Sequence, residues 1–140
     1  MRLALIGCGK TKATEPCAAR DMYRGPLFRA ALAHCEPRYD RVLIVSAFHD
    51  LLALDEVIQP YDRTMAGMSQ HEREVWGDRV ASSVVQRCQG LTSVDIFAGA
   101  DYADPIYVGL YRRSVMAFRP LRGMTQGARL SWFKTAREAE

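Results

Sequence analysis

The amino-acid sequence predicts a single α/β domain in three layers, a mainly parallel sheet of about four strands with helices on both faces. Short, almost continuous apolar runs alternate along the chain with longer stretches of helical spacing. This alternation is typical of parallel strands that are buried on both faces and joined by helical crossovers. The length of 140 residues and the hydrophobic content of 49% fit one globular domain over residues 1–140.

Each predicted strand is an apolar run that ends near a glycine, a serine or a proline. Val42–Val45, for example, is apolar throughout and rich in β-branched residues, which favour strands. The predicted strands are Arg2–Gly7, Arg41–Ser46, Ser93–Ala98 and Val115–Phe118. The segment 47–68 carries several polar residues and is expected to be a long loop.

Capping residues mark where the predicted helices begin. Ser69 and Glu72 have the spacing of a capping box, which predicts a helix that ends near Cys88. Asp104 and Pro105 have the pattern of an N-cap and a first-turn proline, which predicts a short helix to the region of Arg113. The other predicted helices run from Pro26 to the residues before Pro37, and from Thr125 through Leu130, Trp132 and Phe133.

Composition and charge exclude several classes of protein. The apolar runs are too short to span a bilayer, and no secretory signal follows Arg2, so a cytoplasmic protein is expected. The net charge of +3 suits an anionic ligand but does not by itself indicate nucleic acid. The cysteines form no C-x-x-C pair, so free thiols are expected, with Cys35 and Cys88 packed. The histidines lack the spacing of metal ligands, and neither a metal nor a cofactor is predicted.

The carboxyl ends of the predicted strands are the expected place for a ligand, because open α/β sheets bind ligands at this edge. Four segments would meet there, and they hold much of the polar and glycine-rich sequence. The segments are Gly7–Lys12, Ser46–Asp62, Gly99–Tyr102 and Arg119–Gly123.

The first of these segments favours an anion. Gly7 and Gly9 let backbone N–H groups point inward, and Lys10 and Lys12 supply positive charge. A Walker A loop is excluded, because Ala4 stands where that pattern needs its first glycine. The alternative is that the glycines only turn the chain and both lysines face solvent.

The second and third segments carry the candidate catalytic groups. His49 is a candidate acid or base, and Asp55 either acts in the site or caps a helical turn. A triad of Ser46, His49 and Asp101 can be written, but Ser46 lacks the G-x-S-x-G elbow. After Gly99, Tyr102 either stacks on a base or packs over the sheet edge.

Several motifs resemble those of a family of small, uncharacterised bacterial and phage domains. Its members typically read C-x-K-x-K, A-R-D-L-Y-x-S-x-L-F, L-S-A-x-x-G-L-L and D-x-x-I-x-P-Y-D. The similar segments here are Cys8–Lys12, Ala19–Arg29, Val45–Leu52, Asp55–Asp62, Phe97–Tyr102 and Pro120–Gly127. The chain departs from the pattern at Gly25, His49 and Asp50, where serine, tyrosine and glycine are usual.

The resemblance implies that the motif residues share one site at the strand ends. They are Cys8, Lys10, Lys12, Arg20, Asp21, Tyr23, Ser46, Asp55, Pro60, Tyr61, Asp62, Gly99 and Tyr102. A more distant similarity, in Ser46, Leu51–Leu52 and Gln59–Tyr61, is to the YaaA peroxide-stress proteins, which are linked to DNA binding and oxidative damage. The expected sheet is also similar in outline to uracil-DNA-glycosylase-like folds.

The leading hypothesis is an enzyme-like domain that acts on a nucleotide or a nucleic acid. Lys10 and Lys12 would hold phosphate, and Tyr61 or Tyr102 would stack on the base. An acid would activate water or stabilise an oxocarbenium charge at an N-glycosidic bond. The candidate catalytic residues are Ser46, His49, Asp55, Asp62 and Asp101; the candidate binding residues are Cys8, Gly9, Lys10, Lys12, Arg20, Tyr23, Tyr61, Gly99 and Tyr102.

Two alternatives come from other classes of protein. A non-catalytic DNA-binding protein would present a basic face made from Arg20, Arg24, Arg29, Arg38, Arg41, Arg112 and Arg113. An accessory domain would use an exposed apolar loop with Phe48, Leu51 and Leu52 for a partner or for a homodimer contact. Cys8 is either a reactive thiolate or a packed side chain.

Overall fold

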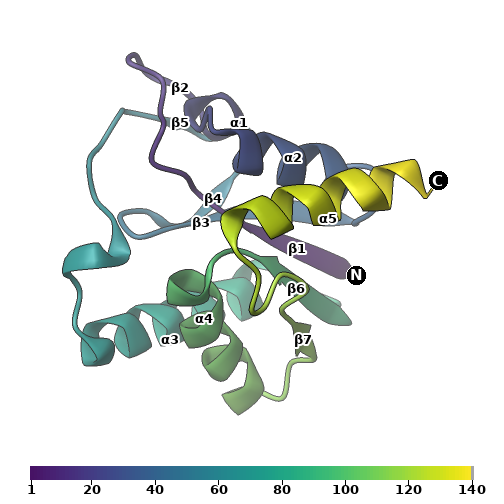
Figure 1. Ribbon diagram of the computed structural model, residues 1–140. Coiled ribbons are helices and arrows are strands. Elements are labelled where there is room, and N and C mark those ends of the chain that lie inside the picture. Colours follow the sequence, from purple (N-terminus) through teal and green to yellow (C-terminus); the bar gives the residue numbers. More distant parts are fainter. Residues whose placement is uncertain (140) are drawn as a thin grey trace.

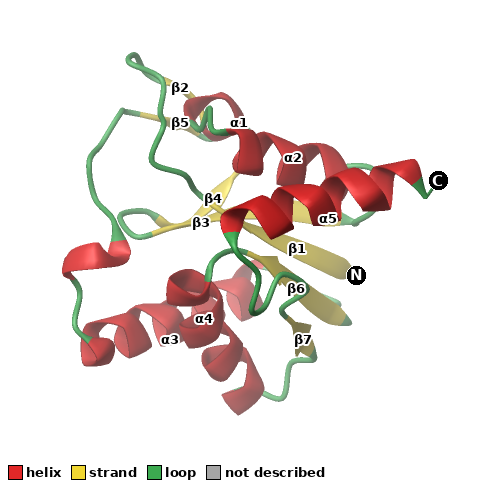
Figure 2. Ribbon diagram, viewed as in Figure 1, coloured by secondary structure: helices red, strands yellow, loops and turns green. Residues whose placement is uncertain are grey.

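A computed structural model describes residues 1–139, which form a five-stranded sheet with helices on both faces (Figures 1 and 2). The strand order is β4-β3-β1-β6-β7. Four strands are parallel: β1 (Arg2–Gly7), β3 (Arg41–Ser46), β6 (Ser93–Phe97) and β7 (Ala117–Phe118). The edge strand β4 (Asp50–Ala53) runs antiparallel to β3. The prediction of a single α/β domain with a mainly parallel sheet is confirmed.

Successive side chains of the central strand β1 enter two separate cores. Leu3 and Leu5 pack against α3 (Gln70–Arg87) and α4 (Ala100–Arg112) on one face. Ala4 and Ile6 pack on the other face, where α2 (Pro26–Cys35) and α5 (Gln126–Glu138) lie side by side (Figure 1). Because strand side chains alternate between faces, a run that is apolar throughout supplies both cores. For this reason the sequence of β1 is apolar throughout, instead of alternating between apolar and polar residues.

The segment expected to be a long loop contains further structure. It holds β4, then β5 (Val57–Ile58), which pairs with β2 (Cys17–Ala18) in a small antiparallel sheet, and a 3₁₀ helix, η1 (Met65–Gly67). The short helix α1 (Ala19–Met22) follows β2. Leu51 and Leu52 lie in β4 and are buried, so the expectation of an exposed apolar loop is wrong for these two residues. Phe48 alone of the three is exposed.

Helix α4 begins earlier than predicted. Gly99 is its N-cap, and Asp104 and Pro105 lie inside the helix instead of starting it. An internal proline removes one backbone hydrogen bond of the helix, and at this residue α4 also crosses α3 closely. A Cβ on Gly77 of α3 would lie 2.4 Å from the Pro105 carbonyl carbon. The contact between these two residues is therefore possible only with glycine in α3.

The expectations for the starts of α3 and α5 and for the cysteines are confirmed, whereas the last strand, expected over Val115–Phe118, is limited to Ala117–Phe118. Ser69 and Glu72 form the capping box of α3, and Thr125 caps α5. All four cysteines are free, and Cys35 and Cys88 are buried; burial raises the pKa of the Cys35 thiol to about 12. Within residues 1–139, no helix is long and apolar enough to cross a membrane.

Candidate functional site

The carboxyl ends of three parallel strands bring distant segments together. Cys8 follows β1, Ser46 ends β3, and Gly99 follows β6. The register pairs Gly7 with Val45 and Ile6 with Phe97, so these three ends are level. The Cys8 N–H donates to the Val45 carbonyl oxygen at 3.1 Å, which holds Cys8 beside the end of β3.

Five side chains meet at this edge, and we call them the strand-end cluster: Cys8, Tyr23, Ser46, Tyr61 and Tyr102. Ser46 is fully buried, and its Oγ lies 2.8 Å from the Tyr61 hydroxyl. The Tyr61 hydroxyl also lies 2.5 Å from that of Tyr23. On the other side, the Cys8 Sγ lies 3.7 Å from the Tyr102 hydroxyl, within hydrogen-bonding distance for sulfur. All five are candidate site residues from the sequence.

Ser46 also shapes the turn between β3 and β4. Its Oγ accepts the backbone N–H groups of Phe48 at 3.2 Å and His49 at 3.1 Å. Because its lone pairs are used by these donors, the Ser46 hydroxyl proton is available for the Tyr61 oxygen. The Ser46 carbonyl accepts the indole N–H of Trp76 at 3.1 Å. Ser46 is thus a hydrogen-bonded anchor of the site and lies outside any nucleophile-elbow turn.

The phenols of the cluster stay protonated at neutral pH. Burial raises the pKa of Tyr61 to about 12. Burial, together with the nearby Cys8 thiol, also raises the pKa of Tyr23 and of Tyr102 above the ordinary tyrosine range. A protonated phenol donates and accepts hydrogen bonds. The cluster is therefore suited to orienting a polar ligand group, and its tyrosines do not serve as bases near neutrality.

Aromatic rings extend the cluster to the molecular surface. The Tyr61 ring contacts those of Phe48 and His49, with centroid separations of 5.3 and 5.0 Å. The Lys12 Nζ lies 4.7 Å from the Tyr61 ring centroid, a cation–π distance. His49 Nε2 is buried and has no hydrogen-bond partner among residues 1–139. This rim therefore offers ring faces and a positive charge, and the unpartnered imidazole nitrogen is buried beside it.

Arg129 of α5, the last helix, covers the N-terminus of α4. A Cβ on Gly99 would lie 3.4 Å from Arg129 Nη1, so the guanidinium sits directly against this glycine. In the described part of the chain, the buried Arg129 Nε has no hydrogen-bond partner, and no side chain caps α4. The helix N-terminus has free backbone donors and a partial positive charge. Together with exposed Lys10, this arrangement favours an anion.

The candidate acids lie in three different surroundings. Asp101 is at the start of α4, where it pairs with Arg73 at 3.1 Å, and Asp62 is exposed next to Tyr61. Asp55, with its side chain 94% exposed, lies toward the amino end of β3 and pairs with Arg20 at 3.7 Å. Arg20 also pairs with Glu36. The structure therefore places Asp55 and Arg20 away from the other candidate residues, while Asp62 and Asp101 border the cluster.

Three residues at this edge were not singled out from the sequence. Trp76 packs edge-on against the Tyr102 ring at 5.5 Å, Arg73 holds Asp101, and Arg129 covers Gly99. They come from α3 and α5, and only the tertiary packing of these helices brings them here. The capped start of α5 at Thr125 was visible in the sequence, but nothing local indicated which edge it meets.

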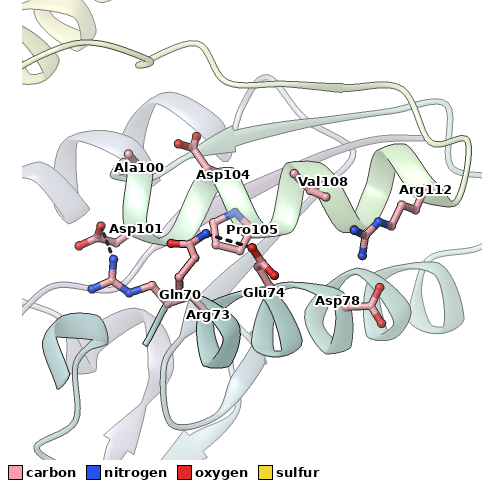
Figure 3. A pocket seen from close by; sticks show the side chains of 11 residues that line it. Gln70, Arg73, Glu74, Asp78, Ala100, Asp101, Asp104, Pro105, Val108 and Arg112 are labelled. Atoms are coloured by element: carbon pink, nitrogen blue, oxygen red, sulfur yellow. Dashed lines mark hydrogen bonds and ion pairs between the residues drawn. The ribbon is translucent and has the colours of Figure 1, made fainter. Parts of the chain in front are cut away.

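The pocket drawn in Figure 3 lies beside the cluster, between α3 and α4. Its volume is about 220 Å³. It adjoins the cluster through Arg73 and Asp101, whose ion pair is visible in Figure 3. Its other charged groups include Glu74, Asp78 and Arg112. None of the cluster side chains lines it, so this groove is separate from the predicted site.

The basic residues named for DNA binding do not form one face. Arg29 lies on α2 and Arg112 on α4, and these helices cover opposite faces of the sheet. Arg113 pairs with Asp78 at 2.7 Å, and Arg20 is paired as described above. Over residues 1–139, no group of three or more histidine, cysteine or acidic side chains is placed to hold a metal ion.

The chain belongs to the family DUF6884, a family of unknown function, which it matches over residues 3–135. This confirms that the chain is a member of a family of uncharacterised domains, as its motifs indicate over nearly the whole chain. A comparison with curated proteins finds no match.

Proposed function

We propose that the protein binds a nucleotide, free or within a nucleic acid, at the strand-end cluster. The phosphate would lie between the N-terminus of α4, Arg129 and the lysines of the loop after β1. The observation that carries this proposal is the Arg129 guanidinium, whose buried Nε is unpartnered while Nη1 faces the uncapped helix end. A phosphate supplies acceptors for both the guanidinium and the free N–H groups of the helix.

The base would lie on the aromatic rim. Tyr61 offers a half-buried ring with Lys12 above it and Phe48 beside it. Tyr102 is less suited to stacking, because the ring packed against it, Trp76, is fully buried, whereas the Phe48 ring beside Tyr61 is exposed. Of the two tyrosines expected to bind a base, Tyr61 is therefore the better candidate.

The reaction that we propose is hydrolysis of the N-glycosidic bond of the bound nucleotide, in which water bonds to the sugar carbon and the base leaves with a proton. Asp101 and Asp62 border the cluster, and either carboxylate would activate water or stabilise the oxocarbenium charge. Asp55 provides a matched control, since it is an exposed acid at the amino end of β3. In an assay of base release, Asp101→Asn or Asp62→Asn should abolish activity and Asp55→Asn should not. Equal activity in all three variants would contradict the assignment.

Binding is tested by thermal shift and calorimetry with AMP, adenosine and ribose phosphate. AMP should raise the melting temperature, and adenosine should bind more weakly because it lacks the phosphate. Arg129→Gln should weaken AMP binding by about tenfold or more, the loss of one charge-assisted contact. Arg137→Gln, in the last turn of the same helix, controls for net charge and should bind as the wild type does. Unaltered AMP affinity in Arg129→Gln, Lys10→Ala and Lys12→Ala would remove the phosphate site.

We also propose a distant relation to the YaaA peroxide-stress proteins. The similarity rests on Ser46, Leu51–Leu52 and Gln59–Tyr61, and in this structure Ser46 and Tyr61 are hydrogen-bonded partners at 2.8 Å. The shared residues therefore include a contact that shapes the site, which supports a common architecture there. A poor superposition of Ser46 and Tyr61 on their counterparts in the structure of a YaaA protein would count against the relation.

A further inference from the structure

Phe48 is an exposed ring held in a fixed place beside the cluster. It is 53% exposed at the tip of the turn between β3 and β4. Ser46 accepts its backbone N–H, and its ring contacts those of His49 at 4.8 Å and Tyr61 at 5.3 Å. A single exposed apolar residue usually needs no explanation. This one continues the aromatic surface of Tyr61 outward, which a second stacked base would cover.

Three basic residues lie on the two loops that carry the Lys12–Tyr61 contact. Lys12 lies over Tyr61, Lys10 precedes it in the same loop, and Arg63 follows Tyr61 by two residues. Within residues 1–139 none of the three makes an ion pair, whereas Arg73, Arg79, Arg87, Arg113 and Arg119 each do. The exposed acids Asp62 and Glu15 lie on the same two loops. Glu72 of α3 is also near Arg63, whose charge adds to the Ser69 hydrogen bonds that lower the pKa of this carboxyl. Stacking rings flanked by free cations are the usual surface for single-stranded nucleic acid.

Two other ligands fit these observations less well. A free nucleotide has one base, so the Tyr61 ring alone would satisfy it and Phe48 would remain exposed. A duplex keeps its bases stacked inside, out of reach of an exposed ring, and it needs an extended basic face. The arginines of α2 and of α4 lie on opposite sides of the sheet and do not form one.

From this arrangement we infer that the ligand is a single-stranded nucleic acid, with one base on Tyr61 and its neighbour stacked on Phe48. Lys10, Lys12 and Arg63 would contact the phosphates along the strand. This inference rests on the proposed function, because it extends the same site by one nucleotide. It adds a recognition residue, Phe48, and a substrate class, a strand of at least two nucleotides.

The test is fluorescence polarisation with a labelled oligothymidylate of about ten nucleotides, a typical site size for such surfaces. AMP, thymidine monophosphate and a duplex of the same length compete for binding. We expect the oligonucleotide to bind at least about tenfold more tightly than either mononucleotide, and more tightly than the duplex. Phe48→Ala should weaken oligonucleotide binding by about tenfold and mononucleotide binding by a much smaller factor, because only the oligonucleotide has a second base to stack on this ring.

Phe118→Ala is the matched control, because Phe118 is 51% exposed on the edge strand β7. Its oligonucleotide affinity should equal that of the wild type. Phe48→Trp should keep the affinity, and its added fluorescence should be quenched when the oligonucleotide binds. Since both phenylalanines are exposed, the melting temperatures of the variants should stay close to that of the wild type.

The outcomes separate this inference from the proposed function. Mononucleotides that bind as tightly as the oligonucleotide, with Phe48→Ala harmless, would overturn the inference and leave the proposed function standing. Oligonucleotide binding that is indifferent to Phe48→Ala and lost at high salt would show electrostatic attraction alone, and would also overturn it. A duplex that binds as tightly as the oligonucleotide would also overturn the inference. No binding of mononucleotide or oligonucleotide would overturn both proposals.

Discussion

Asp50 has a left-handed backbone conformation, and Arg79 from α3 holds its carboxylate in a two-point contact. The φ angle of Asp50 is 61°. Arg79 donates from Nε to Oδ2 at 2.6 Å and from Nη2 to Oδ1 at 3.0 Å. Asp50 is the first residue of β4 and pairs with Ser46 across the turn. Glycine is the usual residue for a left-handed position at a hairpin turn. Here an aspartate occupies that position, and its ion pair ties the turn carrying Phe48 and His49 to α3.

Substitutions at Asp50 should separate the backbone effect from the ion pair. Asp50→Ala loses the contact with Arg79 and places a Cβ in a left-handed residue, so the free energy of unfolding should fall by about 1–3 kcal/mol. Asp50→Gly loses the same contact without backbone strain, and should be less destabilising than alanine by about 1 kcal/mol. Urea unfolding measures both differences.

Arg79→Ala completes this comparison. The pair is partly exposed, so removing its arginine should cost no more than about 1 kcal/mol. If Asp50→Gly were as destabilising as Asp50→Ala, the left-handed conformation would carry no cost and the role given to it here would be wrong.

The crossing of α3 and α4 depends on two glycines. A Cβ on Gly77 would lie 2.4 Å from the Pro105 carbonyl carbon, and a Cβ on Gly109 would lie 2.8 Å from the Ala81 Cβ. Gly77→Ala must push the helices apart, so we expect a loss of about 1–3 kcal/mol or more in the free energy of unfolding. Gly109→Ala should act in the same direction. Thermal and urea unfolding of both variants provide the measurement.

Gly127 provides the matched control within another helix. It lies in the first turn of α5, and a Cβ there would meet nothing within 4 Å. Gly127→Ala should therefore stabilise the protein, by up to about 1 kcal/mol, because alanine loses less conformational entropy in a helix. A gain in stability for Gly77→Ala as well would mean that the helices are not in close contact.

Short sequence patterns predicted correctly those elements whose structure depends mainly on neighbouring residues. The apolar run of β1 identified a buried strand, and Ser69 with Glu72 located the start of α3. Parallel strands necessarily bring their carboxyl ends to one edge, so the segments that form the site were also predictable. Cys8, Ser46 and Tyr102 lie at that edge as expected.

Long-range contacts decide the features that the sequence did not reveal. Strand β4 has four residues and begins at a left-handed aspartate, so neither its length nor its turn residues indicated a hairpin. Pro105 had the pattern of a helix start, but it lies inside α4, where it contacts Gly77 of α3. Asp55 was grouped with the site because it lies in the same segment as Ser46, whereas the antiparallel course of β4 carries it to the opposite end of the sheet.

The hydrogen bonds of Tyr61 should make it more important for stability than Tyr23. Tyr61→Phe removes the contacts with both Ser46 and Tyr23, and it leaves the buried Ser46 hydroxyl without this partner. We expect it to lower the free energy of unfolding by about 1–3 kcal/mol, the cost of unsatisfied buried polar groups. Tyr23→Phe removes a single contact and should cost less. Urea unfolding of both variants gives these values.

A double-mutant cycle then isolates the Tyr23–Tyr61 contact. Because the two hydroxyls are 2.5 Å apart, their substitutions should be non-additive, with a coupling energy of at least about 0.5 kcal/mol. Additive effects would show that the hydroxyls do not interact in solution. Ser46→Ala in the Tyr61→Phe background should cost less than in the wild type for the same reason.

The buried phenols should make the protein sensitive to alkaline pH. Burial raises the pKa of Tyr61 to about 12 and raises the pKa of Tyr23 and of Tyr102 above the ordinary range. Unfolded tyrosines titrate near about pH 10, so above that pH the unfolded chain has lost protons that the folded chain retains. Stability then falls as pH rises, because its slope follows the difference in bound protons.

This contribution should be complete below about pH 10. For Tyr61 it should be lost progressively as the pH rises to about 12. The measurement is the urea midpoint from neutral to alkaline pH, with tyrosinate absorbance followed in parallel. In the wild type, absorbance from the cluster should appear together with unfolding, and Tyr61→Phe should show a shallower alkaline loss of stability. Ionisation of these tyrosines near pH 10 in the folded protein would show that the cluster is open to solvent.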